Sequence, residues 1–121
     1  MRGGFLIVAA AVAASGVPAS ALAQDGQGLF RRQCSACHAT EAGQSKIGPS
    51  LAGVAGKKAA SVQGFEYSDA MKASNLTWTD ANLEKYLEDP KATVPGGKMV
   101  FAGLKKPDDA KAVVDYLKTL K

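Results

Sequence analysis

The strongest periodic pattern of hydrophobic positions lies near the C-terminal end of the chain. Apolar residues recur there every three or four positions, which places them on one face of a helix, and polar residues separate them. The apolar positions are Ala110, Val113, Val114, Leu117 and Leu120. Pro107 suits the first turn of a helix, and Asp108 and Asp109 follow where negative charge is favourable. The pattern predicts an amphipathic helix that begins at Pro107.

A second helix is predicted at the start of the hydrophilic part of the chain. Asp25 is a suitable N-cap for a segment that carries Leu29 and Phe30. The end of this helix would deliver Cys34. We expect the C-terminal helix to pack across it near Gly26, because a residue without a side chain permits close approach.

A third helix is predicted in the second half of the chain. Thr79 can cap it, and Pro90 should stop it. The apolar face between them consists of Leu83, Tyr86 and Leu87. A short piece at 68–73 also has a helical pattern.

Glycine- and proline-rich loops separate these helices, and alternating β-branched residues are almost absent. The pattern therefore predicts an all-α fold; the family resemblance described below implies about four or five helices. Loops this long are unusual in a compact domain unless they have a function. Wrapping a cofactor is such a function, because the cofactor provides apolar surface that a short chain lacks.

The first residues have the order of charge and hydrophobicity found in a secretory signal peptide. Arg2 supplies the positive charge, ten unbroken apolar residues follow at 5–14, and small residues end in Ala23. A retained membrane anchor is the alternative, but ten apolar residues fall short of the roughly 20 that a spanning helix needs. We expect cleavage after Ala23, which leaves 24–121 as a single exported domain without a permanent membrane anchor.

Length and charge narrow the class of protein. A domain of fewer than about 100 residues buries a small share of its surface, so disulfides, a metal or a large cofactor often supplement its core. The formal net charge of the chain is +4, which is compatible with an acidic partner. The lysines are scattered and no basic patch with interleaved aromatic residues occurs, so nucleic acid is a poor candidate ligand.

The reactive residues concentrate in one short motif, Cys34-Ser35-Ala36-Cys37-His38, which contains both cysteines and the only histidine. Its C-x-x-C-H spacing is that of covalent c-type haem attachment. The two thiols can add across the two vinyl groups of the porphyrin, and the adjacent imidazole can bind the iron as its proximal ligand. The motif predicts one haem c held by two thioether bonds.

Three other interpretations of the motif are weaker. A thioredoxin-like dithiol would need a strand–helix setting and would leave His38 without a role. A structural zinc site needs about four ligands, and no further cysteine or histidine exists to complete it. A disulfide between Cys34 and Cys37 would close too short a loop to stabilise the chain much.

A six-coordinate haem iron needs a second axial ligand, and no second histidine is available. The alternatives are methionine, lysine, an exogenous ligand or an open position. Met71 and Met99 are the methionines outside the initiator. Met71 lies in a piece with a helical pattern, where core packing is the ordinary role. Met99 follows Pro95 and two glycines in a loop that can approach a flat cofactor, and the pattern favours it.

The order and spacing of further segments resemble the small class I c-type cytochromes, especially mitochondrial cytochrome c and its short bacterial periplasmic relatives. These segments are 26–30, 48–51, 64–70, 76–78, 86–90 and 95–106. The resemblance covers nearly the whole mature chain. It implies the small cytochrome c fold, with the N- and C-terminal helices packed against each other and one haem whose axial ligands are His38 and Met99.

The resemblance also implies roles for five residues around the haem. The carbonyl of Pro49 would accept the free N–H of the proximal imidazole and fix its orientation. Tyr67 and Trp78 would hydrogen-bond a buried haem propionate. Tyr86 would lie near the methionine sulfur, and Phe101 would cover the exposed haem edge. For each aromatic residue, the alternative is core packing alone.

The function that the resemblance implies is one-electron transfer by a soluble periplasmic monomer that is not an enzyme. Its partners would be membrane redox complexes, such as a cytochrome bc-type complex, a terminal oxidase of a respiratory chain or a photosynthetic reaction centre. The lysines that could steer acidic partners are Lys46, Lys57, Lys72, Lys98, Lys105 and Lys106. The alternatives are a dedicated electron-accepting subunit of one dehydrogenase and, with less support, a haem peroxidase, which would lack a second histidine for acid–base work.

Overall fold

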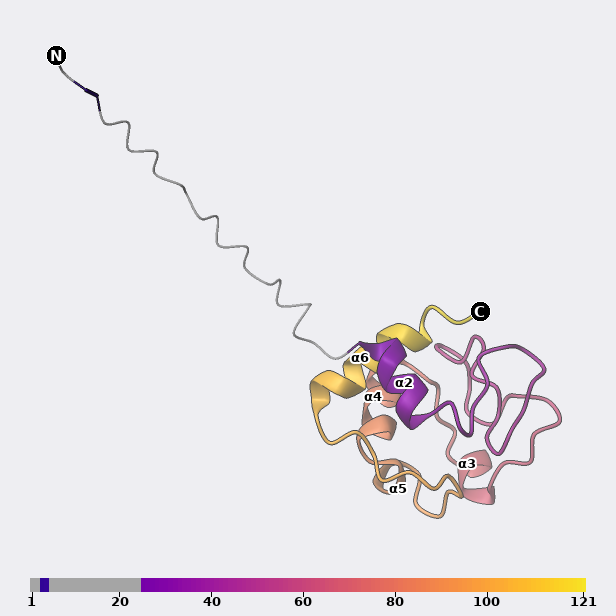
Figure 1. Cartoon of the computed structure of the whole chain (residues 1–121). Coiled ribbons are helices and arrows are strands. Elements are labelled where there is room, and N and C mark those ends of the chain that lie inside the picture. Colours follow the sequence, from indigo (N-terminus) through magenta and orange to yellow (C-terminus); the bar gives the residue numbers. More distant parts are fainter. Residues whose placement is uncertain (1–2, 5–24) are drawn as a thin grey trace.

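The computed structural model describes residues 3–4 and 25–121, and Figure 1 shows helices joined by long loops. The helices in this part of the chain are α2 (Gly26–Gln33), α3 (Asp69–Ala73), α4 (Asp80–Glu88), α5 (Pro90–Thr93) and α6 (Pro107–Leu117). The described residues contain no strand, and Lys58 and Thr77 form an isolated antiparallel bridge. The predicted signal peptide at 1–23 lies outside the described residues, apart from Gly3 and Gly4.

The predicted starts of three helices are confirmed, two by side-chain caps and one by a proline. The carboxylate of Asp25 accepts a hydrogen bond from the backbone N–H of Gln27 at 3.2 Å, and α2 follows. The hydroxyl of Thr79 accepts one from the backbone N–H of Asn82 at 3.2 Å, and α4 follows. α6 begins at Pro107, as predicted. Each side-chain cap supplies an acceptor for an N–H of the first helical turn that has no partner within the helix. A proline in that turn has no N–H, so it leaves none unpaired.

α4 ends at Glu88, just before Pro90, as predicted. Pro90 opens a further helix, α5, because a proline fits the first turn of a helix, and the Asp89 carboxylate accepts the N–H of Ala92 at 3.1 Å. The end of α6 differs from the prediction: α6 ends at Leu117, so Leu120 lies beyond it. Leu120 still packs against the core, because the chain continues in hydrogen-bonded turns after the helix.

The first and last helices cross closely, as predicted. Gly26 lies so near the backbone carbonyl of Ala112 that a Cβ atom there would overlap it. The rings of Phe30 and Tyr116 pack with their centroids 5.3 Å apart. α6 also packs against α4, so the three longer helices form one apolar cluster.

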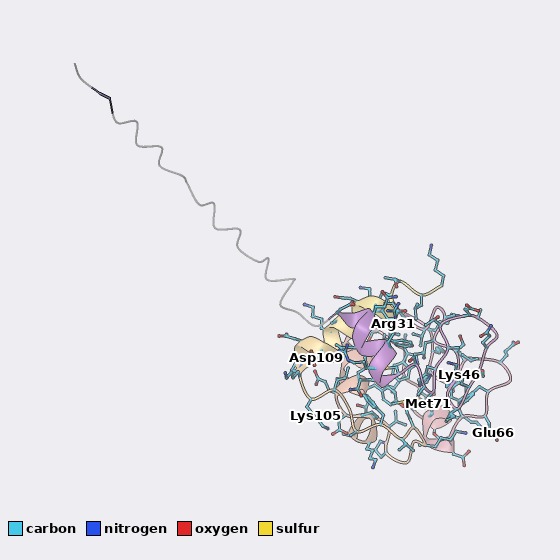
Figure 2. The ribbon with its side chains drawn as sticks, viewed as in Figure 1. Arg31, Lys46, Glu66, Met71, Lys105 and Asp109 are labelled. Carbon is cyan, nitrogen blue, oxygen red and sulfur yellow. The ribbon has the colours of Figure 1, made fainter. Side chains whose placement is uncertain are left out.

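The core of the described residues lies where these three helices meet. Its buried members are Leu29, Phe30, Trp78, Leu83, Leu87, Leu104, Ala110, Val113, Val114 and Leu117. Charged side chains such as Lys46 and Lys105, both labelled in Figure 2, are exposed to solvent. None of the described helices has the length and hydrophobicity that crossing a membrane would require.

Candidate functional site

A cavity of about 590 Å³ lies beside the core. Its volume is within the roughly 300–1,000 Å³ typical of sites for small molecules and cofactors. Apolar side chains form most of its wall, and α2, α4 and α6 each contribute to it. All nine residues singled out from the sequence line this cavity: Cys34, Cys37, His38, Pro49, Tyr67, Trp78, Tyr86, Met99 and Phe101.

The end of α2 brings the cysteines and the histidine to the cavity. The backbone N–H of Cys34 donates to the carbonyl of Phe30 at 2.8 Å, which extends the helical hydrogen bonding by one residue. The chain then turns, and the N–H of His38 donates to the carbonyl of Cys34 at 3.0 Å. This turn presents two sulfur atoms and one imidazole to the same space.

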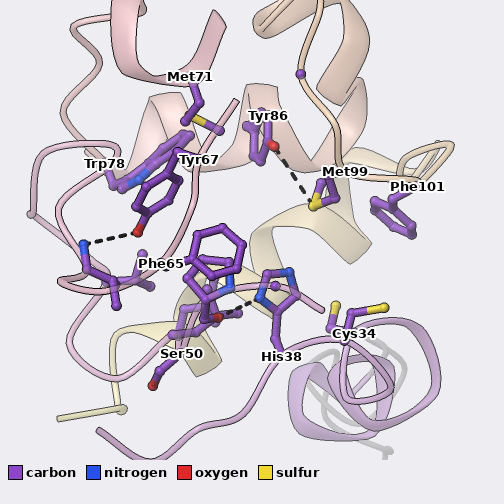
Figure 3. Close-up of a pocket in the computed structure, with 18 of the residues that line it drawn as sticks. Cys34, His38, Ser50, Phe65, Tyr67, Met71, Trp78, Tyr86, Met99 and Phe101 are labelled. Atoms are coloured by element: carbon purple, nitrogen blue, oxygen red, sulfur yellow. Dashed lines mark hydrogen bonds between the residues drawn. The ribbon is translucent and has the colours of Figure 1, made fainter. Parts of the chain in front are cut away.

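The imidazole of His38 is held in one orientation. Its Nδ1–H donates to the carbonyl of Pro49 at 2.8 Å (Figure 3). Burial lowers the pKa of His38, although this hydrogen bond acts in the opposite direction. Burial thus favours the neutral ring, and because Nδ1 carries the proton in this hydrogen bond, the lone pair of Nε2 is available to bind a metal.

Gly48 also determines the position of the His38 ring, which the sequence did not reveal. A Cβ atom at this position would lie 2.7 Å from Nδ1 and 2.9 Å from Nε2 of the imidazole. The N–H of Gly48 donates to the carbonyl of Cys37 at 2.8 Å, so the glycine cannot easily withdraw. A side chain at this position would displace the imidazole.

The thiol of Cys34 is unsuited to dithiol–disulfide exchange. Burial, and then the neighbouring Cys37, raise its pKa to about 11. Exchange requires a thiolate, and oxidoreductases with this spacing lower the pKa of the attacking cysteine. The electrostatics of the site therefore disfavour the thioredoxin-like interpretation.

The opposite wall of the cavity carries the sulfur of Met99. The phenol O–H of Tyr86, on α4, points to this sulfur at 3.8 Å. The ring of Tyr86 packs against Trp78 with centroids 5.0 Å apart. In Figure 3 the Met99 sulfur and the His38 imidazole face each other across the cavity. A nitrogen and a thioether thus approach from two sides, as two axial ligands of one iron would.

Two polar groups interrupt the apolar wall. The oxygen of Tyr67 accepts the backbone N–H of Val62 at 3.0 Å, which leaves its own O–H free to donate. Trp78 is 7% exposed, and its indole N–H can only donate. Both residues line the cavity, so it offers hydrogen-bond donors suited to a carboxylate.

Other lining residues were not singled out as site residues from the sequence. Phe65 packs edge-on against Tyr67, with ring centroids 4.8 Å apart. Met71, for which core packing was the ordinary role, is in α3 and lines the cavity as well as packing against the core. An aromatic residue within a glycine-rich loop is a signal that could have identified Phe65.

Comparison with known proteins agrees with this geometry. Residues 23–121 match the sequence model of the family named Cytochrome c. The chain belongs to the cytochrome c family. This cytochrome is 61% identical to cytochrome c2 iso-2 of Magnetospirillum molischianum over 88 residues, which are 73% of this chain and 91% of that protein.

Two further similarities span more of the chain. Cytochrome c2 of Rhodomicrobium vannielii is 47% identical over 120 residues, which are 98% of this chain and 91% of that protein. The structure of cytochrome cH from Methylobacterium extorquens is similar with a TM-score of 0.74 and 45% identity, covering 78% of this chain and 95% of that chain. The all-α fold with packed terminal helices is therefore confirmed as the small cytochrome c fold.

The cavity suits the cofactor of this family, one covalently attached haem c. Its wall is mostly apolar, both thiols lie at it, and one imidazole exposes Nε2 to it. The two cysteines are the only residues of their type in the chain and have the spacing that two thioether bonds require. The residues present thus fit the group that the motif predicts.

The contact between Gly48 and His38 generates a test. Because a Cβ atom at Gly48 would displace the imidazole, Gly48→Ala should lower the free energy of unfolding by about 1–3 kcal/mol. Urea unfolding of the haem-containing protein measures this. Gly28→Ala is the control, since the nearest atom to its Cβ is the flexible Arg32 side chain at 3.3 Å. Equal stability of the two variants would contradict the assigned role of Gly48.

Proposed function

We propose that this cytochrome accepts one electron from one redox protein and delivers it to another. Cys34 and Cys37 would hold the haem covalently, and His38 and Met99 would bind its iron. When bound, the haem would supply a centre that takes up and releases one electron without transfer of an atom or group. The observation that carries the proposal is the oriented imidazole of His38 facing the Met99 sulfur.

The protein residues contribute orientation and exclusion of water. Pro49 fixes the ring of His38, and Tyr86 holds the sulfur of Met99 through its O–H. Tyr67 and Trp78 would donate to a haem propionate from within the apolar wall. Phe101, which is half-buried, would cover part of the haem edge. A rigid, dry site suits electron transfer, because little rearranges when the charge of the iron changes.

An enzymatic role such as peroxidase has less support. Peroxide cleavage needs an acid–base group beside an open iron position. Among the described residues that line the cavity, His38 is the one imidazole and no carboxylate is present. The methionine on the other side would also occupy the position that a peroxide needs. The alternative is that this protein is a dedicated electron-accepting subunit of one dehydrogenase. That alternative changes its partner but not its electron-transfer chemistry.

The two methionines allow a direct test of the axial ligand. Met99→Leu should abolish the weak far-red absorption band of the oxidised protein that reports a methionine–iron bond. Met71→Leu removes the other thioether of the cavity and should leave the band intact, because Met71 acts there by packing. Absorption spectra of the two oxidised proteins decide the matter. Loss of the band in Met71→Leu instead would contradict the assignment.

The surface around the cavity suits an acidic partner. Lys57, Lys58 and Lys98 line the cavity and are exposed to solvent. Two large apolar side chains at its wall are also exposed, Ile47 by 80% and Val100 by 99%. We expect membrane redox complexes to dock here: a cytochrome bc-type complex, a terminal oxidase or a photosynthetic reaction centre.

Salt dependence tests this docking. The rate constant for reduction by an isolated cytochrome bc-type complex, or for oxidation by an isolated terminal oxidase, should fall about tenfold or more from low to high ionic strength, because salt screens the attraction. Reduction by an uncharged hydroquinone serves as control and should change little. If the rate constant of the partner reaction changed as little with salt as that of the hydroquinone control, steering by the lysines would be excluded.

We also propose a periplasmic location. Attachment of a c-type haem takes place outside the cytoplasm, and the sequence order at 1–23 is that of a signal peptide. The intact mass of the protein from a periplasmic extract should equal residues 24–121 plus one haem. A mass that includes 1–23 would contradict cleavage after Ala23.

A further inference from the structure

The carbonyl that orients the imidazole of His38 belongs to Pro49, so the position of Pro49 decides the position of the ring. A proline has no backbone N–H and cannot donate a hydrogen bond that would fix its own main chain. Its two neighbours supply such bonds instead. On one side, the N–H of Gly48 donates to the carbonyl of Cys37 at 2.8 Å. On the other side, the fixed point is Ser50.

Among the described residues, Ser50 is the one polar side chain that is buried, with 4% of its surface exposed. Its hydroxyl donates a hydrogen bond to the carbonyl of Glu41 at 2.6 Å and accepts one from the backbone N–H of Ala52 at 3.2 Å. A buried hydroxyl without partners would be costly, and here both its donor and its acceptor are used. The hydroxyl therefore joins residues 50–52 to the chain that follows His38.

The bond from Ser50 belongs to a set that ties the segment after His38 to the segment around Pro49. In the same set, the N–H of Leu51 donates to the carbonyl of Ala39 at 2.9 Å. Figure 3 shows Ser50 on the same side of the cavity as His38. Besides the imidazole, the Ser50 hydroxyl is the one side-chain group in this set, so one substitution can weaken the set without removing a main-chain bond.

We propose that Ser50 is a positioning residue that sets, through Pro49, the strength of the hydrogen bond to the imidazole of His38. Its hydroxyl holds the Pro49 carbonyl in line with Nδ1–H, and so keeps Nε2 a strong electron donor to the iron. The proposal rests on the proposed function, in which His38 is an axial ligand. A serine with a structural role alone would change the stability of the protein but not the donor strength of the imidazole.

The reduction equilibrium of the haem-containing protein is the first readout. A hydrogen bond from Nδ1–H to a carbonyl raises the basicity of a ligating imidazole, which stabilises ferric iron more than ferrous iron. Ser50→Ala should weaken this bond. The equilibrium constant for reduction by ferrocyanide should therefore rise about threefold, which a spectrophotometric titration measures.

The proton in this hydrogen bond is the second readout. In the reduced haem-containing protein, which is diamagnetic when both axial ligands are bound, NMR can follow the exchange of the His38 Nδ1 proton with water. Ser50→Ala should make this exchange about fivefold faster, because the bond to Pro49 opens more readily when its acceptor is less firmly held.

Ser74 provides a matched control. Its hydroxyl also donates to a carbonyl, that of Met71 at 2.7 Å, and accepts the N–H of the residue two positions further on, Leu76, at 3.4 Å. These bonds lie at the end of α3, away from the segments that hold Pro49. Ser74→Ala should lower stability in urea unfolding, but it should leave the reduction equilibrium and the proton exchange near those of the unmodified protein.

If either readout changed no more in Ser50→Ala than in Ser74→Ala, the proposal would be overturned. The ligation on which it rests is checked separately in the unmodified reduced protein, where a porphyrin bound to the imidazole should shift the ring protons of His38 far upfield. Without that shift, the proposed ligation fails, and the role of Ser50 fails with it. With that shift and no difference between the two alanine variants, only the role of Ser50 fails.

Discussion

The hydrogen bond from the imidazole of His38 to the carbonyl of Pro49 is the contact on which the rest of the site depends. It joins the chain just after α2 to a loop eleven residues further on, and it fixes which imidazole nitrogen keeps its proton. Gly48 makes this contact possible, because only a residue without a side chain leaves room for the ring. The metal-binding lone pair is therefore directed by backbone geometry, which a change of redox state disturbs little.

The core and the haem cavity are built from the same side chains. Phe30, Leu83, Leu87, Val113 and Leu117 belong to the buried cluster of α2, α4 and α6, and they also line the cavity. A chain this short cannot maintain two separate apolar regions. A haem bound in the cavity would cover apolar faces that the helices do not cover for one another, so its retention would be coupled to the folding of the helices.

The methionine side of the cavity is organised differently from the histidine side. His38 follows directly from a capped helix, whereas Met99 lies in a loop supported by side chains. Tyr86 and Lys98 hold this loop from two directions, one from α4 and one through a hydrogen bond to the carbonyl of Glu66. Loops held by few contacts open more readily than helices do. The imidazole of His38 and the sulfur of Met99 are therefore held by segments of different local stability.

Local patterns in the sequence determined much of this protein. Periodic apolar positions and capping residues predicted α2, α4 and α6, and the C-x-x-C-H motif with its family resemblance predicted which residues line the cavity. These signals depend on neighbours in the chain, so they can be recognised without coordinates. The tertiary structure alone decided the contact of Gly48 with His38 and the contact of Lys98 with Phe65 and Glu66. Each pairs residues in loops without a periodic pattern, and only the packing of those loops around the cavity brings them together.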